Sequence, residues 1–440
     1  MNLNRVVRRL VGCRLWLPTL LLFIAVAPAV ADDWPQWGGT NRDIVWREKG
    51  IVKTLPTNGL LPRVWSTPIG EGYSGPSVAN GRVYVMDRIK SEGNERVLCL
   101  DAADGKILWK HDYRVQYTVD YPAGPRMTPL VDEDRLYTIG AMGHMFCFKA
   151  ATGDVVWSKN FSDDFGTTIP VWGMVASPVV DGTRLITLVG GSNKGLVVCF
   201  DKLTGAEIWR ALEDSEPGYA PPMLFTFDGT PQVIVWHPHA VSSLDPASGK
   251  VYWEIPWSIK AGLCVPAPRQ IGNRLFLTAF YNGPFMIEIG PGGKTAKIAW
   301  KGKSNSEQEA RTDGLHSIMP TPWVTEQNIY GICSYGQLRC LDAKTGARIW
   351  ETRKATGEGR WWNAFLIPHE DQFFIHNEQG DLIIAELTPA GYKELSRAKL
   401  VAPTREVIGR MTIWSHPAFA MQSVFARNDK EIVRVNLAQK

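Results

Sequence analysis

The residues CLDAKTGARIW (340–350) contain a pattern that returns along the whole chain and predicts its fold. The pattern is an apolar residue, Asp, two spacers, a small polar residue, Gly, three residues and Trp. Copies stand at CLDAADGKILW (99–109), CFKAATGDVVW (147–157), CFDKLTGAEIW (199–209) and SLDPASGKVYW (243–253). Weaker copies end at Trp300 and Leu395, and Trp65 precedes the first copy. These eight marks lie 44 to 52 residues apart, a period that predicts a radial array of sheet units.

The residue types of the repeat suit a turn between two strands. The Asp accepts backbone hydrogen bonds at the start of the turn, and the Gly adopts the positive φ that folds the chain back. The Trp on the following strand is a large flat side chain that fills the gap between neighbouring sheets. Because the feature repeats around the ring, we interpret it as scaffold and not as a ligand site.

A Pro-centred segment precedes each copy of the repeat, as in SGPSV (74–78) and ASPVV (176–180), and hairpin signals such as Asn80-Gly81 follow it. Each unit is therefore four strands: an inner strand, two middle strands and an outer Trp-bearing strand. The sequence predicts an all-β, eight-bladed β-propeller with four-stranded antiparallel blades. The last unit, from Trp414, ends before its outer strand, so residues 61–67 should complete the C-terminal blade and close the ring.

Residues 1–31 have the pattern of an export signal. Four arginines precede an apolar run from Leu15 to Val26, and Ala29-Val30-Ala31 predicts cleavage after Ala31. Removing this segment leaves 44 basic and 44 acidic residues, so the sequence indicates no nucleic-acid partner. We expect residues 32–440 to form a single propeller domain, a monomer without a membrane span, in the periplasm or otherwise exported.

The repeat resembles the pyrroloquinoline-quinone-type propeller repeat, most fully at Leu341-Asp342-Ala343-Lys344-Thr345-Gly346-Ala347-Arg348-Ile349-Trp350. The opening DWPQWGGTNRD (33–43) and the closing stretch from Trp414 are similar to an exported bacterial branch of that family. That branch commonly has Trp-Arg-Gly-Pro where this chain has Trp37-Gly38-Gly39-Thr40. The resemblance implies the fold. For function it implies either a non-enzymatic propeller, such as that of outer-membrane barrel assembly, or a quinone-dependent alcohol dehydrogenase.

Three functions follow: a scaffolding propeller of the cell envelope, a propeller that binds a glycan or small ligand, and a quinoprotein dehydrogenase. The resemblance implies that a dehydrogenase would hold pyrroloquinoline quinone between a tryptophan and a disulfide of adjacent cysteines, with calcium held by Glu, Asn and Asp. No two cysteines of this chain are adjacent. The sequence therefore favours a non-catalytic protein without a tight cofactor, whose partner is an envelope protein, a glycan or a small ligand.

Cysteines and histidines give no catalytic or metal site in the sequence. Four of the six cysteines after residue 31 occupy one repeat position, where a small buried free thiol is expected; for Cys264 and Cys333 a disulfide remains open. His237-Pro238-His239 is the closest histidine pair, and no third ligand is near it in sequence.

Residues that depart from the repeat mark the candidate site. Aligning the starts of the inner strands brings together aromatic, Arg, His and Asn side chains that should ring one mouth of the central channel. The candidate ligand-binding residues are Tyr73, Arg126, Trp172, Tyr219, His316, Arg360, Trp361, Trp362, Asn363, Arg410, Trp414 and His416. The alternative is that these side chains fill the channel and pack the loops around it.

Overall fold

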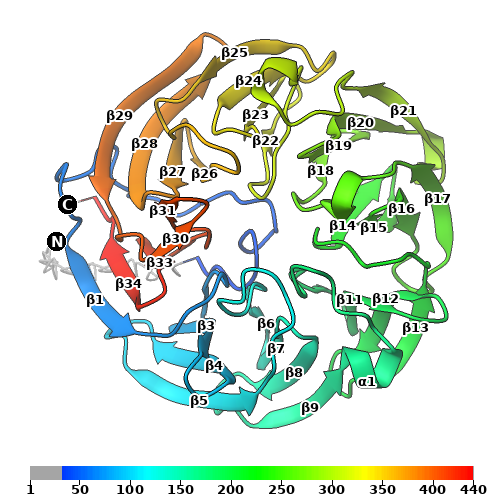
Figure 1. Cartoon of the computed structure of the whole chain (residues 1–440), viewed down its shortest axis with the longest axis horizontal. Helices are drawn as coiled ribbons and strands as arrows, with labels where there is room; N and C mark the ends of the chain where they lie inside the picture. Colours follow the sequence, from blue (N-terminus) through cyan, green and yellow to red (C-terminus); the bar gives the residue numbers. More distant parts are fainter. Residues whose placement is uncertain (1–31, 440) are drawn as a thin grey trace, which may run out of the picture. The chain divides into compact units, whose positions relative to one another are not determined.

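A computed structural model describes residues 32–439 of the chain, which belong to one compact unit. The expected signal peptide, residues 1–31, lies outside the described residues. Eight separate four-stranded antiparallel sheets follow one another around a ring (Figure 1), so the predicted all-β, eight-bladed propeller is confirmed. No helix among residues 32–439 is long and apolar enough to cross a membrane.

The first four blades run from inner to outer strand in chain order. They are β2 (Ser77–Ala79), β3 (Arg82–Ile89), β4 (Asn94–Asp101) and β5 (Ile107–Arg114); β6 (Leu130–Asp132), β7 (Arg135–Ile139), β8 (His144–Lys149) and β9 (Val155–Asn160); β10 (Val179–Asp181), β11 (Arg184–Gly191), β12 (Gly195–Asp201) and β13 (Glu207–Ala211); and β14 (Met223–Phe227), β15 (Thr230–His237), β16 (Ala240–Leu244) and β17 (Val251–Pro256).

The next three blades follow the same order, and the eighth takes its outer strand from the other end of the chain. They are β18 (Arg269–Ile271), β19 (Arg274–Ala279), β20 (Gly283–Ile289) and β21 (Ala296–Lys301); β22 (Trp323–Val324), β23 (Asn328–Ile332), β24 (Leu338–Asp342) and β25 (Arg348–Thr352); β26 (Ala364–His369), β27 (Gln372–Asn377), β28 (Asp381–Thr388) and β29 (Gly391–Lys399); and β32 (Ala418–Ala420), β33 (Ser423–Arg427), β34 (Glu431–Asn436) and β1 (Arg63–Pro68).

Little regular structure lies outside the eight blades. A two-stranded hairpin, β30 (Arg405–Val407) and β31 (Arg410–Thr412), precedes the last blade. The single α-helix of the described residues, α1 (Phe161–Phe165), is one turn long. Three 3₁₀ turns, η1 (Lys260–Gly262), η2 (Pro291–Gly293) and η3 (Glu309–Arg311), complete the set.

The ring closes as the sequence predicts. Strand β1 pairs antiparallel with β34, with Ser66 opposite Val433. Arg63 adds an ion pair to Glu431, its Nη1 lying 2.6 Å from Oε2. Since β1 follows the N-terminal segment and β34 ends the chain, the last blade joins sequence positions more than 360 residues apart.

The repeat Trp and Gly contact each other across blades. Trp65 of the eighth blade lies against Gly105 of the first, and Trp109, Trp157, Trp209 and Trp300 lie in the same way on the turn glycine of the next blade. A Cβ added to these glycines would stand 2.6 to 2.7 Å from the indole ring, and their φ values are positive. The Gly is thus required twice, for the turn and for the neighbouring Trp. The predicted scaffold role of the motif is confirmed for these blades.

The repeat cysteine stands opposite the Trp of its own blade. Cys99 pairs with Trp109, Cys147 with Trp157, and Cys199 with Trp209 across the outer two strands, and a β-bulge follows each pair. A small apolar side chain fits beside so large a neighbour. All six cysteines of the described residues are buried and free, Cys264 and Cys333 included.

The segment from Trp34 to Trp46 crosses one end of the central channel, where it runs inside the ring (Figure 1). Its backbone bonds Val78 of the first blade, Val131 of the second and Pro368 of the seventh. Arg42 donates to Pro178 O at 2.9 Å, and Arg269 of the fifth blade donates to Asp43 O at 2.9 Å. These partners come from blades around the ring and lie in or next to the inner strands. The segment therefore closes the end opposite the predicted mouth.

Candidate functional site

A cavity of about 200 Å³ occupies the axis of the propeller on the open side of the N-terminal segment. Trp37 reaches it from that segment, and the other lining residues come from the loops and inner strands of the blades. Eight of the lining side chains are aromatic and none is acidic: Trp37, Tyr73, Tyr121, Arg126, Thr128, Trp172, Val175, Ser177, Tyr219, Pro221, Leu263, Val265, Ile318, Met319, Thr321, Trp361, Phe365, Trp414 and His416.

A period of two residues explains which side chains reach the cavity. In an extended segment, residues i and i+2 point to the same side. The residue before the repeat proline lines the cavity in most blades, and so does the residue two positions earlier. These pairs are Arg126 with Thr128, Val175 with Ser177, Tyr219 with Pro221, Met319 with Thr321, and Trp414 with His416.

Seven of the twelve sequence-predicted residues line the cavity: Tyr73, Arg126, Trp172, Tyr219, Trp361, Trp414 and His416. The other five, His316, Arg360, Trp362, Asn363 and Arg410, are not among its lining residues. Trp37, Tyr121, Thr128 and Ser177 were not predicted. The two-residue period before each repeat proline would have identified Thr128 and Ser177 from the sequence.

Aromatic rings meet around the rim of the cavity. Tyr73 stacks on Trp414, with ring centroids 6.2 Å apart at an interplanar angle of 30°. Tyr121 meets both Trp361 and Trp414 edge to face. Trp172 lies against Tyr219, with centroids 5.5 Å apart. Such walls present flat apolar faces to a ligand.

Glu378 holds three of the predicted residues in place from behind the rim. It is fully buried and accepts hydrogen bonds from Arg410 Nε at 2.6 Å, Trp414 Nε1 at 3.1 Å and the Asn363 backbone at 3.1 Å. Burial raises the pKa of Glu378, against the pull of Arg410. Arg410 and Asn363 therefore support Trp414 and its loop, whereas Trp414 itself faces the cavity.

The remaining three predicted residues pack outside the cavity. His316 is buried and its Nδ1 lies 3.1 Å from Phe280 O. Arg360 bonds the Tyr281 hydroxyl at 2.9 Å and lies over the Trp361 ring. Trp362 is buried against Gly336 and Gly357. Trp361, between them in sequence, has a φ of +65°, a conformation uncommon for a bulky residue.

Arg126 is the only Arg or Lys side chain that lines the cavity, and it has no carboxylate partner among residues 32–439. Its Nη atoms donate to the carbonyls of Gly124 at 2.8 Å, Asp120 at 2.7 Å and Tyr121 at 2.9 Å. The guanidinium lies 5.3 Å from the Tyr73 ring centroid. Burial lowers the pKa of Arg126 from its usual value.

His416 lies deeper in the cavity wall. Its Nε2 is 2.7 Å from Thr128 Oγ1, and the ring packs against Gly75 so closely that no side chain would fit there. Burial lowers the pKa of His416 to about 4, so the ring is neutral near pH 7. Together with Ser177 and Thr321, it gives the cavity a few neutral polar groups.

The lining does not fit a pyrroloquinoline quinone held with calcium. Calcium requires six to eight oxygen ligands, commonly Asp and Glu carboxylates, and the resembled enzymes add a disulfide against the quinone. No Asp, Glu, Asn or Cys lines the cavity. Residues 32–439 also contain no cluster of three or more His, Cys, Asp or Glu side chains with metal-binding geometry.

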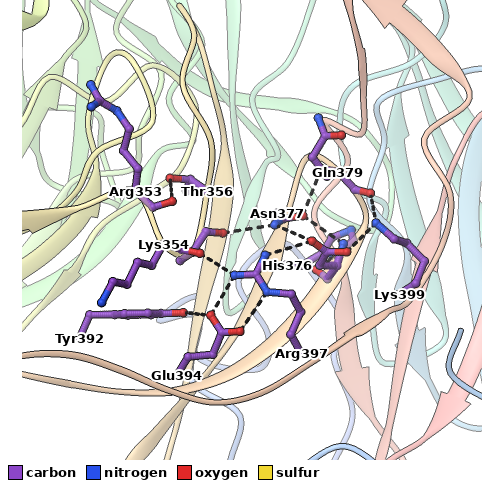
Figure 2. A network of polar contacts seen from close by, with 12 residues as sticks. Arg353, Lys354, Thr356, His376, Asn377, Gln379, Tyr392, Glu394, Arg397 and Lys399 are labelled. Atoms are coloured by element: carbon purple, nitrogen blue, oxygen red, sulfur yellow. Dashed lines mark hydrogen bonds and ion pairs between the residues drawn. The ribbon is translucent and has the colours of Figure 1, made fainter. Parts of the chain in front are cut away.

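Two polar clusters away from the cavity are held together by internal hydrogen bonds and ion pairs. Asp214 lies between the histidines of the His237-Pro238-His239 pair, with His239 Nδ1 2.5 Å from its Oδ1. On the seventh blade (Figure 2), Arg397 bonds Glu394, and Lys399 bonds the Gln379 carbonyl at 2.8 Å. Since Asp381 pairs with both Arg397 and Lys399, and Asp214 bonds both histidines, we interpret these clusters as structural.

Residues 42–137 and 93–352 match the family model described as outer membrane protein assembly factor BamB. The chain belongs to this family. The matches together cover most of the chain, and the eight blades built on one repeat agree with the propeller repeat that the sequence resembles.

Curated relatives are enzymes that match only in part. Quinohemoprotein alcohol dehydrogenase ADH IIB of Pseudomonas putida is 26% identical over 167 residues, which cover 36% of this chain and 22% of that protein. The dehydrogenase subunit of the quinone alcohol dehydrogenase of Komagataeibacter europaeus is 32% identical over 140 residues, 28% of this chain and 18% of that protein. The matches thus span about a fifth of the length of these relatives.

Two kinds of solved structure share the fold. BamB from Moraxella catarrhalis has a TM-score of 0.59 at 15% identity, covering 86% of this chain and 98% of that chain. Quinohemoprotein alcohol dehydrogenase from Comamonas testosteroni has a TM-score of 0.61 at 15% identity, covering 93% of this chain and 81% of that chain. At 15% identity the likeness shows the fold alone.

Proposed function

We propose that the protein is an exported, non-catalytic binding propeller of the cell envelope, which holds a small ligand or a short segment of a partner in its axial cavity. The observation that carries this proposal is the cavity itself. It is closed at one end by the N-terminal segment, walled by aromatic rings and free of acidic side chains. Such a cavity can bind, but it offers no carboxylate as a general base and no metal ligand set.

The cellular setting of the proposal rests on the sequence and on the family. Residues 1–31 have the pattern of an export signal. The family is described by a role in outer-membrane protein assembly. A scaffolding role in the envelope is consistent with this description, and the axial cavity adds a binding site to it.

A quinoprotein dehydrogenase is the second candidate, because the curated relatives are quinone-dependent alcohol dehydrogenases. The cavity chemistry argues against it, since neither a calcium ligand set nor a cysteine pair lines the axis. A dehydrogenase would need its acid–base group and its cofactor contacts at this position. The two candidates therefore differ in what the purified protein binds.

The test measures intrinsic tryptophan fluorescence while the protein is titrated with panels of neutral, cationic and anionic small ligands and oligosaccharides. We expect saturable quenching that is lost in Trp414→Ala. Trp257 is the matched control, because it stacks on Trp236 and Phe285 and does not line the cavity. Binding that survives Trp414→Ala and Trp361→Ala but fails in Trp257→Ala would contradict the proposal, as would alcohol oxidation by the purified protein.

A further inference from the structure

We infer that the ligand of the axial cavity is an aromatic carboxylate: a flat ring that lies against the aromatic walls and carries an anionic group facing Arg126. This inference deepens the proposed binding function and depends on it. It starts from a charge that the fold leaves without a counterpart. The guanidinium of Arg126 lines the cavity, and its hydrogen bonds within residues 32–439 go to backbone carbonyls alone.

The other arginines of the rim differ from Arg126 in this respect. Arg405 pairs with Asp429 at 2.6 Å, Arg410 with Glu378 at 2.6 Å, and Arg360 lies 3.5 Å from Glu307. None of these three lines the cavity. The fold therefore neutralises the arginines that support the rim and leaves unpaired the one that faces the cavity.

Arg126 retains donors for a ligand. A guanidinium has five N–H groups, and the carbonyls of Gly124, Asp120 and Tyr121 take three of them. The same three bonds fix the plane of the group, which lowers the entropy lost when a carboxylate binds. The two remaining donors and the positive charge favour an anion over a neutral group of the same shape.

Surrounding charges reinforce this preference. No acidic side chain lines the cavity, so no fixed negative charge in its wall opposes an anion. After Tyr117 and Tyr73, the group that acts on Arg126 is the carboxylate of Glu95, which is already bound by the hydroxyls of Tyr113 and Tyr117 and by the Ala141 backbone N–H.

The walls and the size of the cavity select the rest of the ligand. Tyr73, Tyr121, Trp361 and Trp414 form contiguous aromatic faces beside Arg126. The cavity of about 200 Å³ exceeds the roughly 150 Å³ of a protein cavity that takes up benzene, which leaves room for one substituted ring. A free aromatic acid and the carboxyl-terminal aromatic residue of a polypeptide share this chemistry.

The experiment compares 3-phenylpropionate with 3-phenylpropanamide, two probes of the same shape that differ in charge. Binding to the purified protein is followed by titration calorimetry. We expect the acid to bind about tenfold or more tightly than the amide, the worth of a charged hydrogen bond, and to weaken as NaCl is raised. Arg126→Gln should abolish the preference for the acid, and Arg126→Lys should keep part of it. The control Arg311→Gln removes one positive charge at an exposed position outside the cavity, and this variant should keep the full preference for the acid.

A second pair of probes identifies the source of the ligand: a tetrapeptide ending in Phe with a free carboxylate, and the same peptide amidated. Tighter binding of the peptide acid than of 3-phenylpropionate assigns the site to a polypeptide end, and the reverse order assigns it to a free acid. Equal affinity for acid and amide, or a preference that survives Arg126→Gln, overturns the inference. If the inference fails but the proposed binding function holds, neutral ligands still bind and their binding still depends on Trp414. If the inference and the proposed function both fail, no probe binds.

Discussion

At the scale of single residues, the Trp and Gly of the repeat act as one unit shared by two blades. Trp209 packs on Gly249 of the next blade and donates its Nε1 to Pro246 O at 3.0 Å. The motif therefore requires both the Trp and the Gly, one from each of two neighbouring blades. The turn glycine provides the flat surface on which the indole packs, and the indole sets the distance between the two blades.

Gly249→Ala tests this unit against Gly229→Ala. Both glycines have a positive φ, but a Cβ at Gly249 meets Trp209 at 2.6 Å, whereas a Cβ at Gly229 meets nothing within 4 Å. We expect Gly229→Ala to cost about 1–2 kcal/mol through the backbone alone. Gly249→Ala should cost a further 1–3 kcal/mol, roughly, through overpacking. Chemical denaturation measures both, and equal losses would contradict the shared role of the glycine.

Trp209→Ala removes the other half of the same unit. The indole is almost fully buried and its loss leaves a cavity between two blades. We expect the free energy of unfolding to fall by about 3–5 kcal/mol. A thermal melting temperature close to that of the wild type would show that the blades meet without the tryptophan.

Buried histidines make the stability depend on pH. His376 is buried, its Nδ1 lies 3.1 Å from Asp381 O, and burial lowers its pKa from 6.5 to about 4. The unfolded chain therefore takes up a proton near pH 6.5, before the folded protein does. Stability should be full above pH 6.5 and fall as the pH approaches 4, by up to about 3 kcal/mol. In His376→Gln the denaturant midpoint should fall less steeply between pH 6.5 and 4, and the part of the fall that His416 causes should remain. An unchanged pH dependence of the midpoint would contradict the role of His376.

At the scale of elements, β1 acts as the closing strand of the ring. It covers the edge of β34 and brings Trp65 to the first blade. Deleting residues 32–68 should expose that edge and cause aggregation. Deleting residues 32–49 removes the cavity floor but keeps β1, so this control should remain a monomer of lower stability. Size-exclusion chromatography distinguishes the two, and a monomeric, cooperatively melting 32–68 deletion would contradict the role of β1.

The elements also show what the sequence could and could not predict. The blades followed from a repeat in which turn, strand and inter-blade contact are all local or one blade apart, as with Gly105 and Trp65. The path of the N-terminal segment could not follow in this way, because Arg42 meets Pro178, which is 136 residues away. The loops before the inner strands differ in length, so the starts of the inner strands could not be aligned reliably from the sequence. His316 and Arg410 therefore joined the predicted mouth, although neither lines the cavity.

At the scale of the whole molecule, the two ends of the channel have different roles. The segment from Trp34 to Trp46 bonds inner strands around the ring and closes one end. The loops that lead into the inner strands leave a cavity at the other. Eight similar blades thus give a rigid frame, and the residues that break the repeat determine what the frame can bind. Because the chain is partly similar to quinone-dependent dehydrogenases, cofactor binding is the property of the whole molecule to test.

We expect that the protein, mixed with pyrroloquinoline quinone and calcium, shows neither stoichiometric tight binding nor dye-linked oxidation of alcohols. The reason is the cavity lining, which offers one arginine to a carboxylate but no Asp, Glu or Asn to calcium and no cysteine pair to the quinone. Any binding of the quinone should therefore be weak, independent of calcium and weaker still in Arg126→Gln, which removes the group that its carboxylates would meet. Equilibrium dialysis with and without calcium measures this. Calcium-dependent, submicromolar binding with turnover of an alcohol would establish the dehydrogenase instead.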